Sequence, residues 1–195
     1  MDAHSLLQYE DRLLEPGRFD GHLIEGCVPD LTFAQFSDID LDQLTALGAE
    51  NLLLDVDGTL LPVYSSTCDP LNEPTAHKLG QMLSDERFKT VNLATENGAR
   101  PESMLSFLGM SATSRVFQRW EGGDPGESGK VTKGFWRRIL FEIDCLETPE
   151  KTAIIGNSLT RDIAVPQSLG LKTVLVGTLM RQRRYEWLLY DEQDT

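Results

Sequence analysis

The chain has 195 residues, and its 31 acidic side chains against 18 basic ones give a formal net charge of −13 and a pI near 4.6. Its 40% hydrophobic and 25% charged residues are typical of a globular domain, which excludes a disordered or fibrous protein. The negative charge argues against nucleic-acid binding, and no apolar run approaches the roughly 20 residues that span a bilayer.

Short apolar runs alternate with longer amphipathic segments, and this pattern predicts an α/β fold with a parallel sheet flanked by helices. Asp40–Leu47 predicts a short capped helix that ends at Gly48. The expected strands are Asn51–Val56, Thr90–Ala94, Arg115–Gln118, Ala153–Gly156 and Lys172–Val176. The expected helices are Pro74–Ser84, Pro101–Leu108, Thr132–Cys145 and Thr160–Leu169, of which the last is kinked or shortened by Pro166.

We expect one α/β domain at residues 38–180, between an N-terminal leader at 1–37 and a C-terminal basic and aromatic tail at 181–195. The leader shows no clear periodicity and predicts a surface wrap or a frayed end. The first twenty residues do not resemble a signal or transit peptide, so a cytoplasmic location is expected. In the tail, a solvated helix is the favoured interpretation, and a membrane-surface or partner patch formed by Arg181, Arg183 and Arg184 is the alternative.

The cysteines are few and widely spaced, which favours buried small side chains over a disulfide framework or a zinc site. A thiol-based phosphatase would have an arginine six residues after its cysteine. The residues at that distance from Cys27, Cys68 and Cys145 are Phe33, Pro74 and Lys151, so this class of enzyme is excluded.

The sequence that carries most chemical information is the apolar run that ends in Asp55-Val-Asp-Gly-Thr59. Two carboxylates at the carboxyl end of a strand repel each other and need a cation, a shared proton or both, and oxygen ligands favour Mg²⁺. Asp55 could attack phosphorus as a nucleophile, while Asp57 could protonate the leaving oxygen and then deprotonate water. A simple strand-ending turn is the alternative. A calcium loop is excluded, since no Glu follows at the required spacing.

Asp55–Thr59 resembles the first motif of the haloacid dehalogenase (HAD) superfamily of phosphatases, and segments resembling the other three motifs follow in order. The second motif implies that Thr95, with Glu96 and Asn97, binds the substrate phosphoryl group. The third implies a phosphate-binding lysine, either Lys130 or Lys133, with Lys130 favoured. The fourth implies that Asn157 and Asp162 complete a Mg²⁺ site with Asp55 and Asp57, although Asn157 stands where the family has an acid.

The spacing between these motifs leaves no room for a cap domain, so the resemblance implies an open site. Residues 29–178 look like the YqeG-like branch of the capless subclass IIIA, which is similar to mitochondrial phosphatidylglycerophosphate phosphatase. Gly58 and Glu96 depart from that branch, whose members commonly have Asn at both positions.

The function expected from the sequence is therefore Mg²⁺-dependent hydrolysis of a phosphomonoester through an aspartyl phosphate on Asp55. The substrate would be phosphatidylglycerophosphate or another exposed phosphate. One alternative is a non-catalytic HAD-fold binding protein, favoured by Asn157 alone. A second alternative is a mutase, which usually needs a cap to exclude water.

Overall fold

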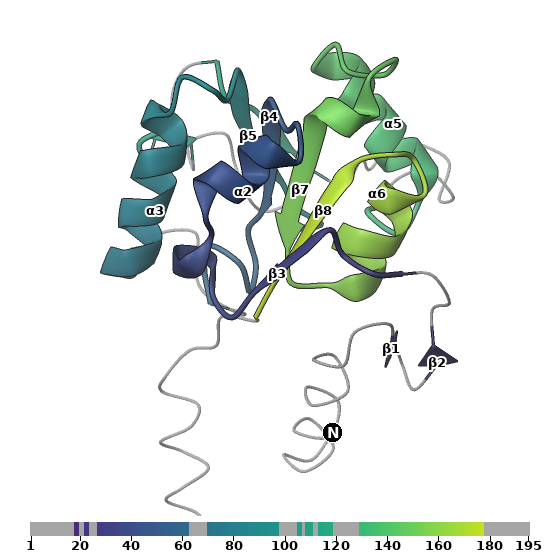
Figure 1. Cartoon of the computed structure of the whole chain (residues 1–195), viewed down its shortest axis with the longest axis horizontal. Helices are drawn as coiled ribbons and strands as arrows, with labels where there is room; N and C mark the ends of the chain where they lie inside the picture. The colour runs from purple at the N-terminus through teal and green to yellow at the C-terminus, as the bar shows by residue number, and fades with distance from the viewer. Residues whose placement is uncertain are drawn as a thin grey trace, which may run out of the picture.

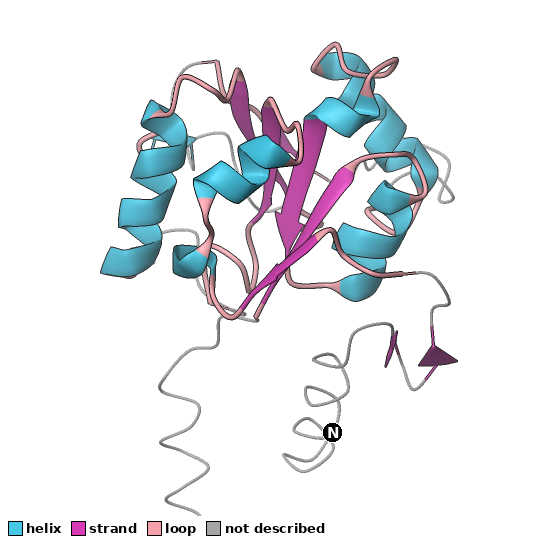
Figure 2. Cartoon of the chain, in the orientation of Figure 1, coloured by secondary structure: helices cyan, strands magenta, loops and turns pink. Residues whose placement is uncertain are grey.

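The computed structural model describes residues 27–62, 70–97, 105–106, 108–110, 113–118 and 129–177, together with the backbone of 18–19 and 22–23. These residues form an α/β fold around a six-stranded, all-parallel sheet (Figures 1 and 2). The strands, in the spatial order β3-β8-β7-β4-β5-β6, are Leu31–Phe33, Lys172–Val176, Thr152–Gly156, Asn51–Asp55, Thr90–Ala94 and Val116–Phe117. Separately, β1 (Arg18–Phe19) and β2 (His22–Leu23) form an antiparallel pair.

All five predicted strands are confirmed, and β5 and β8 have the predicted bounds. The central strand β4 is buried along its whole length because helices cover both faces of the sheet. Its alternate residues therefore enter separate clusters: Leu52 and Leu54 pack with Leu44, while Leu53 packs with Trp136 on the opposite face.

The helices divide between the two faces of the sheet, as Figure 1 shows. On one face lie the 3-10 helix η1 (Phe36–Asp38), α2 (Leu41–Ala46) and α3 (Glu73–Ser84). On the other lie α5 (Lys133–Glu142), η3 (Leu159–Ala164) and α6 (Val165–Gln167). A short 3-10 helix, η2 (Pro149–Lys151), leads into β7. Within the described ranges, no helix combines the length and apolar character needed to cross a membrane.

Side-chain caps explain where the predicted helices begin. Asp40 accepts a hydrogen bond from the Asp42 backbone N–H at the start of α2, and Gly48, at a φ of 84°, follows its last turn. Thr132 caps α5 in the same way. The predicted helix Pro101–Leu108 lies mostly outside the described residues.

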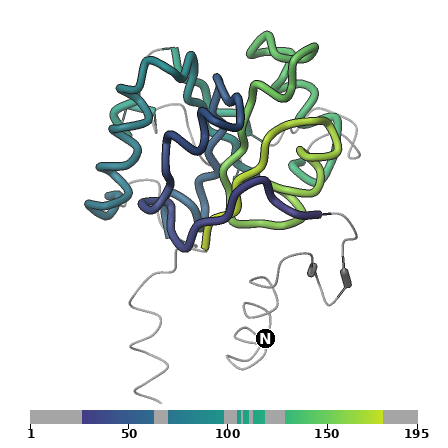
Figure 3. Tube along the Cα trace, in the orientation of Figure 1, coloured from purple at the N-terminus to yellow at the C-terminus, as the bar shows by residue number. Residues whose placement is uncertain are grey.

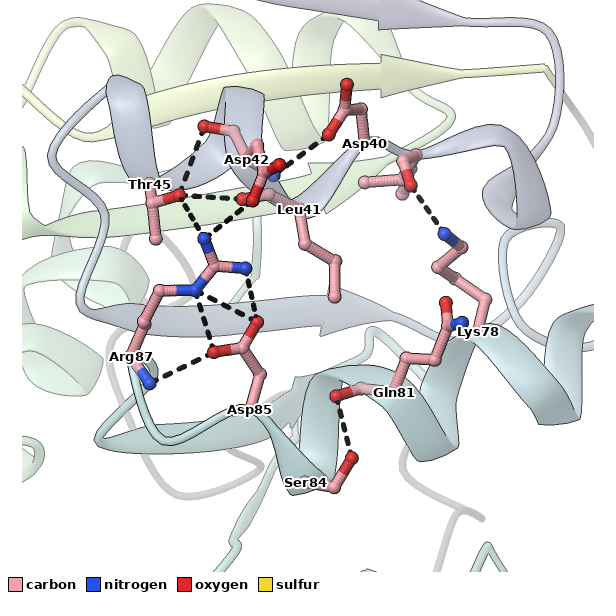
Figure 4. Close-up of polar contacts among 10 residues, drawn as sticks. Asp40, Leu41, Asp42, Thr45, Lys78, Gln81, Ser84, Asp85 and Arg87 are labelled. Atoms are coloured by element: carbon pink, nitrogen blue, oxygen red, sulfur yellow. Dashed lines mark hydrogen bonds and ion pairs between the residues drawn. The ribbon is translucent and has the colours of Figure 1, made fainter.

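An exposed polar network joins α2 to α3 and the turn that follows it (Figure 4). The guanidinium of Arg87 lies 2.7 Å from Asp42 Oδ1 and 2.6 Å from Asp85 Oδ2. Lys78 Nζ donates to the Ile39 carbonyl at 2.7 Å. Solvent screens the exposed pair of Arg87 and Asp42, so this pair adds little to the stability of the fold.

Strand β3 was not expected from the sequence, and it lies inside the predicted leader. It pairs with β8, which comes about 140 residues later in the chain, and the two segments run side by side in Figure 3. On its other side β8 pairs with β7. Asp30 fixes this pairing, because its Oδ2 accepts from the Thr173 backbone N–H at 2.8 Å and from Thr173 Oγ1 at 3.0 Å. A three-residue strand is too short to show a period-two pattern in the sequence.

Candidate functional site

The site begins where β4 ends. Asp55 is the last residue of β4, and the chain turns back at once, because the Leu60 and Leu61 backbone N–H groups donate to the Val56 carbonyl at 3.0 and 2.9 Å. Gly58 occupies this turn with a φ of 88°, a conformation that glycine adopts without steric cost. The turn places Thr59 Oγ1 3.0 Å from Asp55 Oδ2, to which it donates a hydrogen bond.

The end of the neighbouring strand β5 contributes Thr95. Its hydroxyl donates to Asp57 Oδ2 at 3.3 Å and accepts from the Asn97 backbone N–H at 3.0 Å. Because β4 and β5 are adjacent and parallel, their carboxyl ends bring the first two predicted motifs to the same edge of the sheet.

Lys130 lies between two carboxylates at the centre of the site. Its Nζ is 2.5 Å from Asp55 Oδ1 and 2.8 Å from Asp162 Oδ1, and the lysine side chain is 1% exposed. The alternative, Lys133, is exposed at the first position of α5. The structure therefore places Lys130, and not Lys133, beside Asp55.

Asp162 reaches this position from η3, a wide π-helical turn after β7. Pro166 has no N–H to donate to the Asp162 carbonyl four residues earlier, and in a regular α-helix its ring would conflict with that carbonyl, which favours the wider turn of η3 before α6. The carboxylate lies directly against Gly156, where an added Cβ would be 2.4 Å from Asp162 Cγ. Asp162 Oδ2 also accepts from the Ser158 backbone N–H at 3.0 Å.

Burial and neighbouring charges set the protonation of this cluster. Burial raises the pKa of Asp55 from 3.8 to about 6, the charge of Lys130 opposes this shift, and the charge of Asp162 adds to it. Burial alone would lower the pKa of Lys130, but the charges of Asp162 and Asp55 outweigh it and raise that pKa above its ordinary value. The ammonium of Lys130 therefore stays charged at neutral pH.

Three other predicted site residues lie at the same edge with different contacts. The Glu96 carboxylate accepts from the Lys130 backbone N–H at 2.7 Å, so its contact here is with the protein chain. Asn97 is exposed just beyond Thr95, and Asn157 is half-buried directly after β7. The predicted membrane-contact residues Arg181, Arg183 and Arg184 lie outside the described residues.

The sequence analysis gave no role to the side chains of Thr59 and Trp136. Thr59 lies four residues after Asp55 and supports its carboxylate, a contact that this spacing across a tight turn makes predictable. The Trp136 indole N–H donates to the Lys130 carbonyl at 2.7 Å. An aromatic residue six positions after Lys130 is the sequence signal that could have indicated this contact.

The oxygen donors at this edge suit Mg²⁺ in their chemistry, since Asp55 and Asp162 are carboxylates and Asn157 offers an amide oxygen. In the described part of the chain, no three His, Cys, Asp or Glu side chains form a group that could hold a metal ion. Mg²⁺ in phosphate-processing enzymes commonly binds one or two carboxylates and takes its other ligands from water and substrate phosphate. Asp55 and Asp162 can supply the carboxylates of such a site.

Comparisons with family models, curated proteins and solved structures found no match to this chain.

Proposed function

We propose that this chain is a Mg²⁺-dependent phosphomonoester hydrolase of the HAD type, acting through an aspartyl phosphate on Asp55. One observation carries the proposal: Lys130 Nζ lies within 2.8 Å of both Asp55 and Asp162, which stand 75 and 32 residues from it in sequence. A buried lysine held by two acids at the carboxyl edge of a parallel sheet is suited to bind a phosphoryl group beside a nucleophile.

In the first step, an Asp55 carboxylate oxygen attacks phosphorus and the bond from phosphorus to the leaving oxygen breaks. Asp57 donates its proton to that leaving oxygen, and the alcohol departs. Lys130 binds the phosphoryl oxygens by charge, and the Thr95 hydroxyl, which lies beside Asp57, adds a neutral hydrogen bond. Most of the rate enhancement comes from this positioning and charge neutralisation.

In the second step, Asp57 takes a proton from water, and the resulting hydroxide attacks the phosphoryl group. The bond between phosphorus and the Asp55 oxygen breaks, which releases inorganic phosphate and restores the carboxylate. Thr59 holds the other Asp55 oxygen throughout and keeps the carboxylate oriented at the end of β4.

Asp55, the Asp57 carbonyl, Asn157 and Asp162 are the groups that would hold Mg²⁺. When bound, the ion would neutralise charge on the substrate phosphate and so lessen its repulsion by the acids. For the substrate, we infer a phosphomonoester exposed at a surface, such as a lipid headgroup of the phosphatidylglycerophosphate type, because the motif spacing leaves no room for a cap.

The test is a phosphatase assay on aryl, sugar, nucleotide, protein and lipid phosphates with and without Mg²⁺. At least one ester should be hydrolysed in a Mg²⁺-dependent manner, and Asp55→Asn should abolish this turnover, because an amide is not a nucleophile. Asp38→Asn, an exposed change of the same chemistry on η1, is the matched control and should retain full activity. Hydrolysis that persists in Asp55→Asn would exclude the aspartyl phosphate.

The alternative is a HAD-fold protein that binds a partner without catalysis, and the amide at Asn157 is what favours it. Absence of turnover on every class of phosphate in the same assay would select this alternative.

A further inference from the structure

The backbone of Lys130 is buried before α5 begins. Lys130 is 1% exposed, whereas the first helical residue is Lys133 and the capping residue is Thr132. Its peptide N–H and carbonyl therefore lie outside the hydrogen-bonding pattern of the helix. Buried peptide groups need partners, since an unsatisfied group is costly.

Both peptide groups have side-chain partners from different elements. The N–H donates to Glu96 Oε1, just beyond β5, at 2.7 Å. The carbonyl accepts from Trp136 Nε1, in the first turn of α5, at 2.7 Å. Side chains on either side thus hold the Cα of Lys130, while its Nζ contacts Asp55 and Asp162.

The surroundings make these contacts specific. A Cβ on Gly129 would lie 3.1 Å from Glu96 Oε1, so the glycine gives the carboxylate room to approach the backbone. Trp136 is fully buried and packs edge-on against Phe135 with ring centroids 5.2 Å apart, which fixes the direction of its N–H.

We propose that Glu96 and Trp136 are positioning residues that set the place of the Lys130 ammonium by holding its backbone. The catalytic part of this proposal rests on the proposed function, and it gives Glu96 a role different from the substrate binding expected from the sequence. A carboxylate is a poor ligand for a phosphate anion, because their charges repel, but it is a strong acceptor for a backbone N–H.

The first experiment measures hydrogen exchange of the Lys130 amide by NMR in the wild type, Glu96→Ala and Glu96→Gln. Loss of the acceptor in Glu96→Ala should speed exchange by about tenfold or more. Glu96→Gln keeps a side-chain oxygen at this place and should retain most of the protection. Glu86→Gln, an exposed change of the same charge, is the control and should leave this amide unchanged.

The second experiment measures p-nitrophenyl phosphate hydrolysis with the same variants and with Trp136→Phe, which keeps a ring but removes the N–H. A misplaced ammonium should lower kcat by about tenfold or more in Glu96→Ala and Trp136→Phe, with KM within about threefold of the wild type. Glu96→Gln should restore kcat to within about threefold of the wild type.

Equal protection of the Lys130 amide in the wild type and Glu96→Ala would overturn the proposal. A raised KM with unchanged kcat in Glu96→Ala would also overturn it, because that is the pattern of a substrate ligand. A wild type that hydrolyses no phosphomonoester refutes the proposed function instead. In that case the exchange rates still decide whether Glu96 holds Lys130.

Discussion

Replacement of Lys130 by methionine should destabilise the fold strongly at neutral pH. Lys130 and Asp162 are each 1% exposed, Asp55 is 10% exposed, and the ammonium lies 2.5 and 2.8 Å from their carboxylates. Removing one partner of such a buried pair typically costs about 3 to 5 kcal/mol, because it leaves the opposite charge without compensation. This is a large part of the roughly 5 to 15 kcal/mol that stabilises an ordinary domain.

The loss should also depend on pH. With Lys130 present, the pKa of Asp55 is already about 6, above its value of 3.8 for an unperturbed carboxyl, and removal of the lysine should raise it further. A carboxyl whose folded-state pKa exceeds its unfolded value contributes stability that is fully present below about 3.8 and is lost as the pH rises through the folded-state value. The destabilisation by Lys130→Met should therefore be smaller at pH 5 than at pH 7.5.

Urea unfolding followed by far-ultraviolet circular dichroism at both pH values measures these effects. Lys133→Met removes the same charge from an exposed position and should change the free energy of unfolding by no more than about 0.5 kcal/mol. Adding Asp162→Asn to Lys130→Met should recover part of the loss, since it removes one of the stranded charges. A loss below about 1 kcal/mol at pH 7.5, or an equal loss at both pH values, would refute the buried three-residue cluster.

Three further predictions concern the same edge of the sheet. Gly156→Ala should lower the free energy of unfolding, measured in urea, by about 1 to 3 kcal/mol, because the new Cβ would lie 2.4 Å from Asp162 Cγ. Gly80→Ala, in open space on α3, should instead stabilise the protein. A change of the same sign in both variants would contradict this packing. In Mg²⁺-free protein the Asp55 carboxyl, followed by NMR, should ionise with a midpoint near pH 6, because burial raises its pKa, and a midpoint near 3.8 would contradict the burial of this carboxyl. Asn157→Asp should tighten Mg²⁺ binding measured by calorimetry, since it adds a charged oxygen, and an unchanged affinity would place residue 157 outside the metal site.

The sequence by itself determined the main elements of the fold. The mainly apolar runs at Thr90–Ala94 and Lys172–Val176 became strands with the predicted bounds, because a strand buried on both faces is mostly apolar. The polar side chains buried in these strands, Asn92 and Thr173, have hydrogen-bond partners. Helix α2 has the predicted cap at Asp40 and the predicted glycine at Gly48, since capping depends on residues close together in the chain. The predicted bounds also placed Asp55 and Thr95 at the carboxyl ends of two strands, and the parallel pairing of β4 with β5 brings them to one edge of the sheet.

Only the tertiary structure decided which lysine lies beside Asp55 and how it is held. Lys130 and Lys133 are the same type of residue. Which of them lies beside Asp55 depends on where α5 begins relative to Asp162 and Glu96, two residues that follow the ends of other strands. The pairing of Leu31–Phe33 with β8 likewise depends on Asp30 meeting Thr173 across a separation of 143 residues. Such contacts form between segments far apart in the chain, and their geometry is fixed by packing of the whole sheet, so no local pattern of residues encodes them.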